Sequence, residues 1–260
     1  MITVVGAFTL QVLASLGALV ALFGQSVSSV CRQLLFLRFR FREVVLQCYF
    51  VAVESFPVIV FSLTFVSLMM VIELSYHMKL VLRQDSLVPA FSTVLILREL
   101  GPVLTSLLLA SRVGASISAE LGTMRITEQL DALRLLAVDP VEYLVIPRWF
   151  ASVFAAVSLA VVSVAVSIFA GAFIASIQLG LSRWQYFNTM FLFATMDDFK
   201  SCIVKSAVFG TIIPIVASHH GFRCRHGAEG VGNAATLAVV NSSVLIIIAD
   251  FVLTYMLYAV

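Results

Sequence analysis

The chain has 260 residues, of which 61% are hydrophobic and only 12% are charged, and its mean hydropathy is +1.08. Soluble domains are about 45–50% apolar and about 25% charged, so this composition excludes an ordinary water-soluble enzyme. The net charge of +2 gives no reason to expect a nucleic-acid partner. Four scattered cysteines argue against a disulfide framework or a cysteine-based zinc site. We therefore interpret the chain as an integral membrane protein.

Long apolar stretches recur along the chain, and each is long enough to cross a bilayer. The clearest one runs from Trp149 to Ser182 and contains no charged residue. Because charged residues bound each stretch, we predict five transmembrane helices and an all-α, polytopic fold. The other four predicted spans are roughly residues 49–72, 87–110, 201–218 and 234–260.

The N-terminal stretch from Met1 to Cys31 carries no charge and lacks the basic start of a secretory signal. Its glycines and serines lower its hydrophobicity, so it is compatible with a membrane crossing and with an interfacial elbow helix. We therefore divide the chain into two parts. Residues 1–44 form a membrane-embedded or interfacial helix with a basic cytoplasmic segment, and residues 45–260 form the polytopic domain.

The distribution of lysine and arginine predicts the orientation in the membrane. With the basic segment 32–42 in the cytoplasm, the cytoplasmic segments carry ten basic residues and the outer loops carry four. The C-terminus is then on the outside. The cytoplasmic segments are 32–42, 112–148 and 219–226, and the outer loops are 76–86 and 182–200.

The short hydrophilic segments contain no recognisable catalytic motif. A phosphate loop of the form GxxxxGK[ST] is absent, and no Ser/His/Asp or Cys/His arrangement stands out. We therefore expect this chain not to be an enzyme. If it drives uphill work, another chain must supply the energy.

The motif LRELGP (Leu97–Pro102) places Arg98 and Glu99 inside an apolar segment. A charge at the bilayer centre costs about 2.5–3.5 kcal/mol on insertion scales, so both residues need a compensating partner or a polar ligand. One interpretation is a structural ion pair with Asp250 or Lys205, and the other is a contact with the polar headgroup of a ligand. The proline that ends the motif removes a backbone hydrogen bond and predicts a kink.

Small residues recur every four positions in the segment that follows, which places them on one face of a helix. Such a face lets a neighbouring helix approach closely. We therefore predict tight helix packing through Ala110, Gly114, Ser118 and Gly122.

The segment ITEQLDALRLLAVDP (Ile126–Pro140) has the pattern of a short amphipathic helix in a cytoplasmic loop. We expect Thr127 to cap its start and Asp139 with Pro140 to end it. Its apolar stripe has no domain of its own to pack on and favours a partner protein, with a helix lying on the headgroups as the alternative. The stripe consists of Ile126, Leu130, Leu133 and Ala137.

Two polar loops contain residues of the types that bind metals or carry charge. The loop HHGFRCRH (His219–His226) holds imidazoles and a thiol, but its two arginines repel a cation and no second ligand pair occurs elsewhere, so we expect no metal site. In the outer loop, we expect Asp197, Asp198 and Lys200 to be solvated.

Several motifs occur together in an order that resembles the MlaE-type permeases, the transmembrane subunits of MCE-associated ABC lipid transporters. The resemblance runs from about residue 45 to the end, and residues 1–31 match only in position, as the N-terminal interfacial helix of that family. The motifs are LRELGP, SRVGASISAELGTMR, TEQLDAL followed by DP and PR, GAEGVGNAATLAVVNSS and ADFVLT.

The resemblance implies a homodimer in the bacterial inner membrane, with a lipid-binding cavity that opens to the periplasm. It implies movement of phospholipid between this membrane and a periplasmic MCE-domain carrier, which serves outer-membrane lipid asymmetry. ATP and Mg²⁺ are then bound by a separate ABC ATPase subunit, and in many such systems a STAS-domain protein takes part. No cofactor is expected in this chain.

Site residues follow from the same resemblance. Arg98 and Glu99 are expected in or beside the lipid cavity, and the segment Thr127–Leu133 corresponds to the coupling helix that docks on the ATPase. We expect the apolar cavity wall to include Phe65, Leu68, Met69, Ile72 and Tyr76, and the coupling contacts to include Ile126, Glu128, Gln129, Leu130, Asp131 and Leu133.

The chain departs from the family pattern near the start of the last span. Asn233 and Ala235 stand where the family often has arginine and threonine, so a positive charge is lost there. The HHGFRCRH loop is not a family motif.

Two rival functions remain open on sequence grounds. One is an ion-coupled secondary transporter that uses Arg98, Glu99, Lys205 and Asp250 as a relay and needs no ATPase. The other is a membrane subunit that only anchors an MCE-domain protein.

Overall fold

The computed structural model describes residues 41–81, 85–225 and 227–258, and every regular element in this part of the chain is a helix. Its five candidate membrane spans confirm the predicted all-α, polytopic fold. The predicted N-terminal helix at residues 1–31 lies outside the described residues. The spans are Arg42–Leu80, Val88–Ile126, Val141–Gln178, Met196–Phe222 and Gly227–Tyr258.

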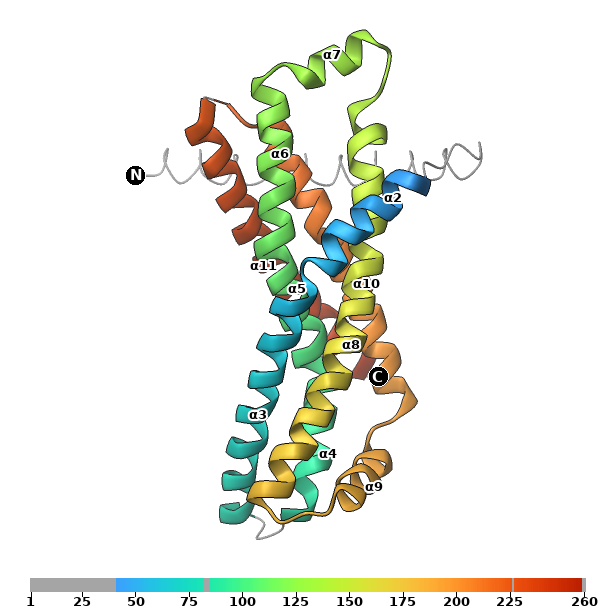
Figure 1. Ribbon diagram of the computed structural model, residues 1–260, viewed down its shortest axis with the longest axis vertical. Helices are drawn as coiled ribbons and strands as arrows, with labels where there is room; N and C mark the ends of the chain where they lie inside the picture. The colour runs from blue at the N-terminus through green and yellow to red at the C-terminus, as the bar shows by residue number, and fades with distance from the viewer. Residues whose placement is uncertain (1–40, 82–84, 226, 259–260) are drawn as a thin grey trace. The chain divides into compact units, whose positions relative to one another are not determined.

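The described residues form two compact units, which we treat separately. Unit 1 comprises residues 41–48, 110–152 and 211–245, and the long helices α8 (Ile146–Gln178), α10 (Met196–Phe222) and α11 (Gly227–Tyr258) contribute to both units. The other elements of unit 1 are α2 (Phe41–Cys48), the π-helical segments η4 (Ala110–Gly114) and η5 (Val141–Val145), α6 (Ala115–Ile126) and α7 (Gln129–Leu135) (Figure 1).

Unit 2 comprises residues 49–109, 153–210 and 246–258 of the described chain. Within it, α4 packs against both α3 and α9 (Figure 1). Its elements besides the shared helices are η1 (Tyr49–Val53), α3 (Phe56–Val81), η2 (Asp85–Leu87), α4 (Val88–Leu95), η3 (Ile96–Leu100), α5 (Gly101–Leu109) and α9 (Arg183–Phe193).

In unit 1, the face of small residues lies against α10. Ala110, Gly114, Ser118 and Gly122 are all buried. A Cβ placed on Gly114 would lie 3.6 Å from Ile213 of α10, and one placed on Gly122 would lie 3.3 Å from the Cβ of Cys224, two residues after α10 ends. The four-residue spacing therefore marks a surface where two helix backbones approach closely.

The amphipathic helix α7 is shorter than the sequence predicts, and its predicted ends are wrong. Thr127 donates its hydroxyl to the Thr123 carbonyl (2.9 Å) and continues α6 instead of capping α7. At the other end, the amides of Ala137 and Val138 donate to the carbonyls of Arg134 and Leu133, both at 3.0 Å. This is a Schellman arrangement with Ala137 at φ +57°, a position where glycine is usual. Without a glycine, the sequence gives no stop signal there.

In unit 2, α3 and α8 are joined by buried hydroxyl groups as well as by apolar packing. Ser67 Oγ donates to the Ser167 carbonyl at 2.7 Å, and Ser167 Oγ donates to the Leu63 carbonyl at 3.3 Å. These reciprocal bonds satisfy polar groups in a setting that is expected to lack water.

Helix α9 occupies part of a segment that the sequence analysis placed in an outer loop. Ser182 and Gln185 form a capping box at its start, in which the Trp184 amide donates to Ser182 Oγ. Tyr186 of α9 packs in an apolar cluster with residues of α3, α4 and α8, and this burial raises the pKa of its hydroxyl. The outer segment is therefore ordered and packed, not a solvated loop.

A close helix approach at Gly101 positions the LRELGP motif. A Cβ at this residue would overlap Cγ2 of Val164 in α8 and lie 2.8 Å from the Ile96 carbonyl oxygen. Glycine is thus required for α5 to approach α8 at this level.

We expect Gly101→Ala to destabilise the protein by about 1–3 kcal/mol, because the added methyl overpacks this contact. Gly232→Ala in α11 is the matched control, since no atom lies within 4 Å of its Cβ position. Melting temperatures of both variants in detergent test this. Equal melting of Gly101→Ala and wild type would contradict the packing argument.

Candidate functional site

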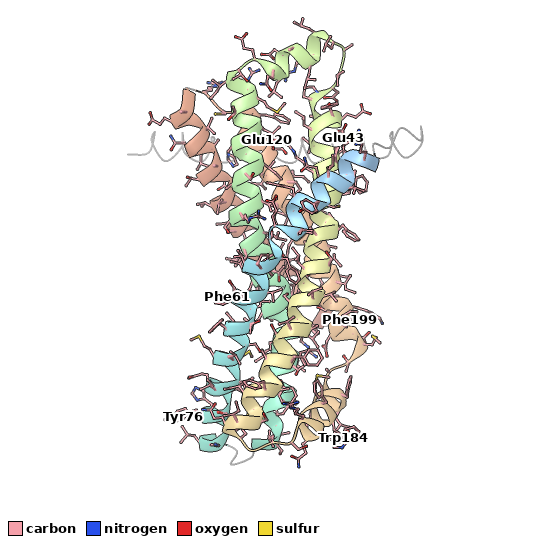
Figure 2. All side chains as sticks on the ribbon, viewed as in Figure 1. Glu43, Phe61, Tyr76, Glu120, Trp184 and Phe199 are labelled. Carbon is pink, nitrogen blue, oxygen red and sulfur yellow. The ribbon has the colours of Figure 1, made fainter. Side chains whose placement is uncertain are left out.

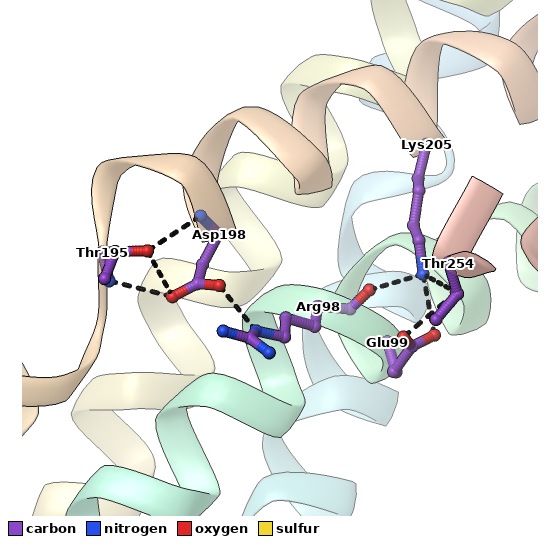
Figure 3. Close-up of polar contacts among 6 residues, drawn as sticks. All are labelled: Arg98, Glu99, Thr195, Asp198, Lys205 and Thr254. Carbon is purple, nitrogen blue, oxygen red and sulfur yellow. Dashed lines mark hydrogen bonds and ion pairs between the residues drawn. The ribbon is translucent and has the colours of Figure 1, made fainter. Parts of the chain in front are cut away.

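The π-helical segment η3 carries Arg98 and Glu99 in unit 2. The Gly101 amide donates to the Ile96 carbonyl, five residues back. Pro102 has no N–H to offer the Arg98 carbonyl, and that oxygen instead accepts a hydrogen bond from Nζ of Lys205 at 2.9 Å (Figure 3). The helix is π-helical just before the proline, and the carbonyl that the proline leaves free binds the Lys205 ammonium.

Lys205 of α10 is the centre of the polar cluster, and its side chain is 0% exposed. Its ammonium lies 2.8 Å from Oε2 of Glu99 and 2.7 Å from Oδ1 of Asp250. It also donates to the hydroxyl of Thr254 at 2.7 Å, and this hydroxyl donates to Oε1 of Glu99 at 3.2 Å. Two carboxylates, a carbonyl and a hydroxyl thus surround an ammonium that has three protons to share.

Arg98 points to a second set of partners. Its Nε donates to Oδ1 of Asp198, which is 1% exposed. The other carboxylate oxygen of Asp198 accepts from the amide and the hydroxyl of Thr195, both at 2.9 Å (Figure 3). The guanidinium also stacks 4.3 Å from the ring centroid of Tyr258. Arg98 nevertheless remains 36% exposed.

These contacts decide between the partners that the sequence left open. Asp250 pairs with Lys205, and Lys205 also pairs with Glu99, so the structural ion pair is present. The expectation that Asp198 is solvated is wrong, because α10 begins at Met196 and buries this carboxylate. Its neighbour Asp197 does face solvent, at 82% exposure, and pairs with Lys200 at 2.9 Å.

Asp198 and Thr195 are site residues that the sequence analysis missed. The sequence TMDD (Thr195–Asp198) before an apolar run has the form of a capping box, with the acidic residue three positions after the cap. This pattern predicts that α10 begins here and that Asp198 binds Thr195 at the N-terminal end of the helix.

The predicted cavity-wall residues lie along one side of α3. Phe65, Met69, Ile72 and Tyr76 are 40–70% exposed, and Leu68 is half-buried. Phe61 continues this side one turn earlier, with its ring centroid 4.7 Å from that of Phe65. Figure 2 shows Phe61 and Tyr76 on the outer side of the helix. In this single chain the face is an open apolar surface.

In unit 1, the predicted coupling segment is held by charged side chains. Asp131 accepts from Nη1 of Arg125 at 2.9 Å and from Nη1 of Arg134 at 2.9 Å, which fixes α7 to the end of α6. Nearby in sequence, the buried Arg148 pairs with Oε1 of Glu120 at 2.8 Å and so joins α8 to α6.

The apolar stripe expected on α7 is only partly available for contact. Leu130 is 1% exposed and packs inside the protein, so it cannot lie on a docking surface. Leu135 and Leu136, at 89% and 73% exposure, are the leucines that this segment presents outward. They were not predicted as contacts, because neither lies on the apolar stripe of Ile126, Leu130, Leu133 and Ala137.

The family model described as Permease MlaE matches residues 44–256. This chain belongs to the MlaE permease family. It is 35% identical over 256 residues to a probable ABC transporter permease protein of Rickettsia felis, covering 98% of this chain and 97% of that one. A Rickettsia typhi relative with the same description is 34% identical over 259 residues, with the same coverage. A Synechocystis relative is 41% identical over 161 residues, covering 62% and 61%.

Family membership makes this MlaE-family chain a permease subunit with several membrane passes. It also places the polar cluster inside a protein that spans the membrane. A buried ammonium held by two carboxylates is costly in an apolar medium unless every charge is compensated. In unit 2 of this permease each of the charges in the cluster has a partner.

We expect Lys205→Met to destabilise the permease by about 3–5 kcal/mol, because it leaves two carboxylates without their shared cation. The triple variant Lys205→Met, Glu99→Gln, Asp250→Asn should recover much of this loss. Lys200→Met on the same helix is the control, expected within about 0.5 kcal/mol of wild type. Unfolding by denaturant in micelles measures these differences, and wild-type stability of Lys205→Met would contradict the central role of this ammonium.

Proposed function

We propose that this MlaE-family chain is the membrane subunit of an ABC transporter that moves phospholipids between the inner membrane and a periplasmic MCE-domain carrier. Two copies would form the transport path, and ATP with Mg²⁺ would be hydrolysed on a separate ATPase subunit. A STAS-domain protein is a further expected partner. Family membership and the printed description of the relatives as ABC transporter permeases support this proposal.

The observation that carries the proposal is the geometry of α7. A seven-residue helix between two long helices is too short to be stable alone in water. Here it is held by Leu130 inside the protein and by the Asp131 ion pairs outside. A packed helix with two exposed leucines at its C-terminal end, on the predicted cytoplasmic side, has the form of a contact site for another protein.

We expect Leu135→Asp with Leu136→Asp to release the ATPase subunit, because two charges would be buried against its surface. The ratio of ATPase to permease after co-purification should fall at least tenfold. Leu192→Asp on α9, at a leucine that is 74% exposed, is the matched control.

The variant Leu130→Asp is a control in the same experiment, because it tests folding of the permease instead of docking. Because Leu130 is buried, this variant should lower the melting temperature of the permease itself. Normal co-purification of the ATPase with the Leu135, Leu136 double variant would contradict the assignment of α7 as the docking element.

For lipid contact, the structure offers an apolar surface and a partly exposed guanidinium within unit 2. The exposed side of α3 is suited to acyl chains, and Arg98 is suited to a phosphate because its planar fork binds phosphate oxygens in pairs. Glu99 is engaged by Lys205 and Thr254 and serves in this proposal to position the motif. The ion-relay alternative has no support from the relatives, which are described as ABC transporter permeases.

We expect Arg98→Gln to lower phospholipid transfer in a reconstituted system by about tenfold or more, the loss typical of one charged hydrogen bond. Because this change also strands Asp198, the paired variant Arg98→Gln with Asp198→Asn is the control for stability. It should melt like wild type and still transfer lipid slowly. Wild-type transfer by the paired variant would show that Arg98 has only a structural role.

A further inference from the structure

A cavity of about 430 Å³ lies in unit 1, where α10 ends and α11 begins, between the HHGFRCRH loop, which is not a family motif, and the first turns of α11. Its volume falls within the range of about 300–1,000 Å³ that is usual for ligand sites. The residues that line it are His220, Arg223, Cys224, Arg225, Glu229, Gly230, Asn233, Ala234 and Leu237.

The charged side chains of this cavity are mostly cationic. Arg223 and Arg225 contribute two guanidinium groups, and Glu229 contributes one carboxylate. Nη1 of Arg223 lies 3.3 Å from Nε2 of His219, which steadies this arginine. Within residues 41–81, 85–225 and 227–258, the side chain of Arg225 has neither an ion pair nor a hydrogen bond, so its five donors are available to a ligand.

The backbone around the cavity is fixed by a close contact. A Cβ at Gly230 would overlap the carbonyl oxygen of Arg225, so glycine is required for the backbone of Arg225 to pack against the first turn of α11. The N-terminal amides of this 32-residue helix add positive potential at the same end. Arg225 is therefore held on a defined backbone beside a helix start that favours anions.

The remaining lining makes the site amphipathic. Cys224 and Ala234 are buried, and Leu237 is 50% exposed about three turns into a helix that is apolar enough to span a membrane. Residues 223–225 follow the end of the α10 span, on the side that the distribution of basic residues assigns to the cytoplasm. Basic pockets between transmembrane helices on that side are suited to the headgroups of anionic lipids.

We propose that this cavity binds the phosphate of an anionic phospholipid from the cytoplasmic leaflet, with Arg223 and Arg225 as the phosphate ligands. The apolar side chains of α11 beyond the cavity would contact the first part of an acyl chain. The chemistry that is recognised is a phosphate anion, which a lipid and free phosphate share. The amphipathic lining favours the lipid. This site does not depend on the proposed transport function.

The test measures lipid retained by the full-length permease after purification from nanodiscs that contain equal amounts of phosphatidylglycerol and phosphatidylcholine. Native mass spectrometry counts the lipids that remain bound. We expect selective retention of phosphatidylglycerol, a loss of about fivefold in Arg225→Gln, and a larger loss when Arg223→Gln is added. Arg183→Gln at the start of α9, an exposed arginine outside the cavity, is the matched control and should leave retention unchanged.

Inorganic phosphate at millimolar concentration distinguishes the two sources of the anion. Weak or absent displacement of phosphatidylglycerol by phosphate supports a lipid site. Protection of the permease against thermal unfolding by phosphate, without selective lipid retention, would overturn the proposal in favour of a free anion. Equal retention of the two lipids, or wild-type retention by the double arginine variant, would overturn the site itself.

Discussion

The ammonium of Lys205 is the interaction on which the interior of unit 2 depends. A lysine with no exposed side-chain surface in an apolar helix bundle is stable only if its charge and its three protons are compensated. The compensation comes from two separate helical segments, since Glu99 and the Arg98 carbonyl belong to η3 and Asp250 and Thr254 belong to α11. One residue of α10 therefore fixes the positions of two other elements. It also explains why the π-helical turn before Pro102 is tolerated, because the carbonyl that the proline leaves free is bound.

Arg98, unlike Lys205, keeps part of its side chain exposed. Its Nε is held by a buried aspartate, and its guanidinium rests on the ring of Tyr258, yet about a third of the side chain stays accessible. A positioned and partly accessible guanidinium is what recognition of a phosphate requires. Adjacent residues in one motif thus have separate tasks: Glu99 completes the internal ion pairs, and Arg98 remains available to a ligand.

Much of this could be predicted from the sequence, for physical reasons that differ between features. The spans could be predicted from long apolar stretches and the charges that bound them, and the charges of LRELGP indicated a polar cluster because insertion of unpaired charges is costly. The pairing of these charges could not be predicted from the sequence, because Lys205 and Asp250 are far from Glu99 along the chain. Asp198 was misplaced because two neighbouring aspartates look alike until the helix start is known. Leu130 belongs to the predicted apolar stripe and Leu135 does not, and only the packing shows that Leu130 is buried while Leu135 is exposed.

We propose that this permease moves phospholipid with energy supplied by another chain. Transfer of a fluorescent phospholipid out of proteoliposomes to the MCE-domain carrier tests it most directly, with the permease reconstituted alone and with its ATPase subunit, each with and without ATP. The account predicts transfer above background only when ATPase subunit and ATP are both present. Equal transfer by the permease alone would contradict it.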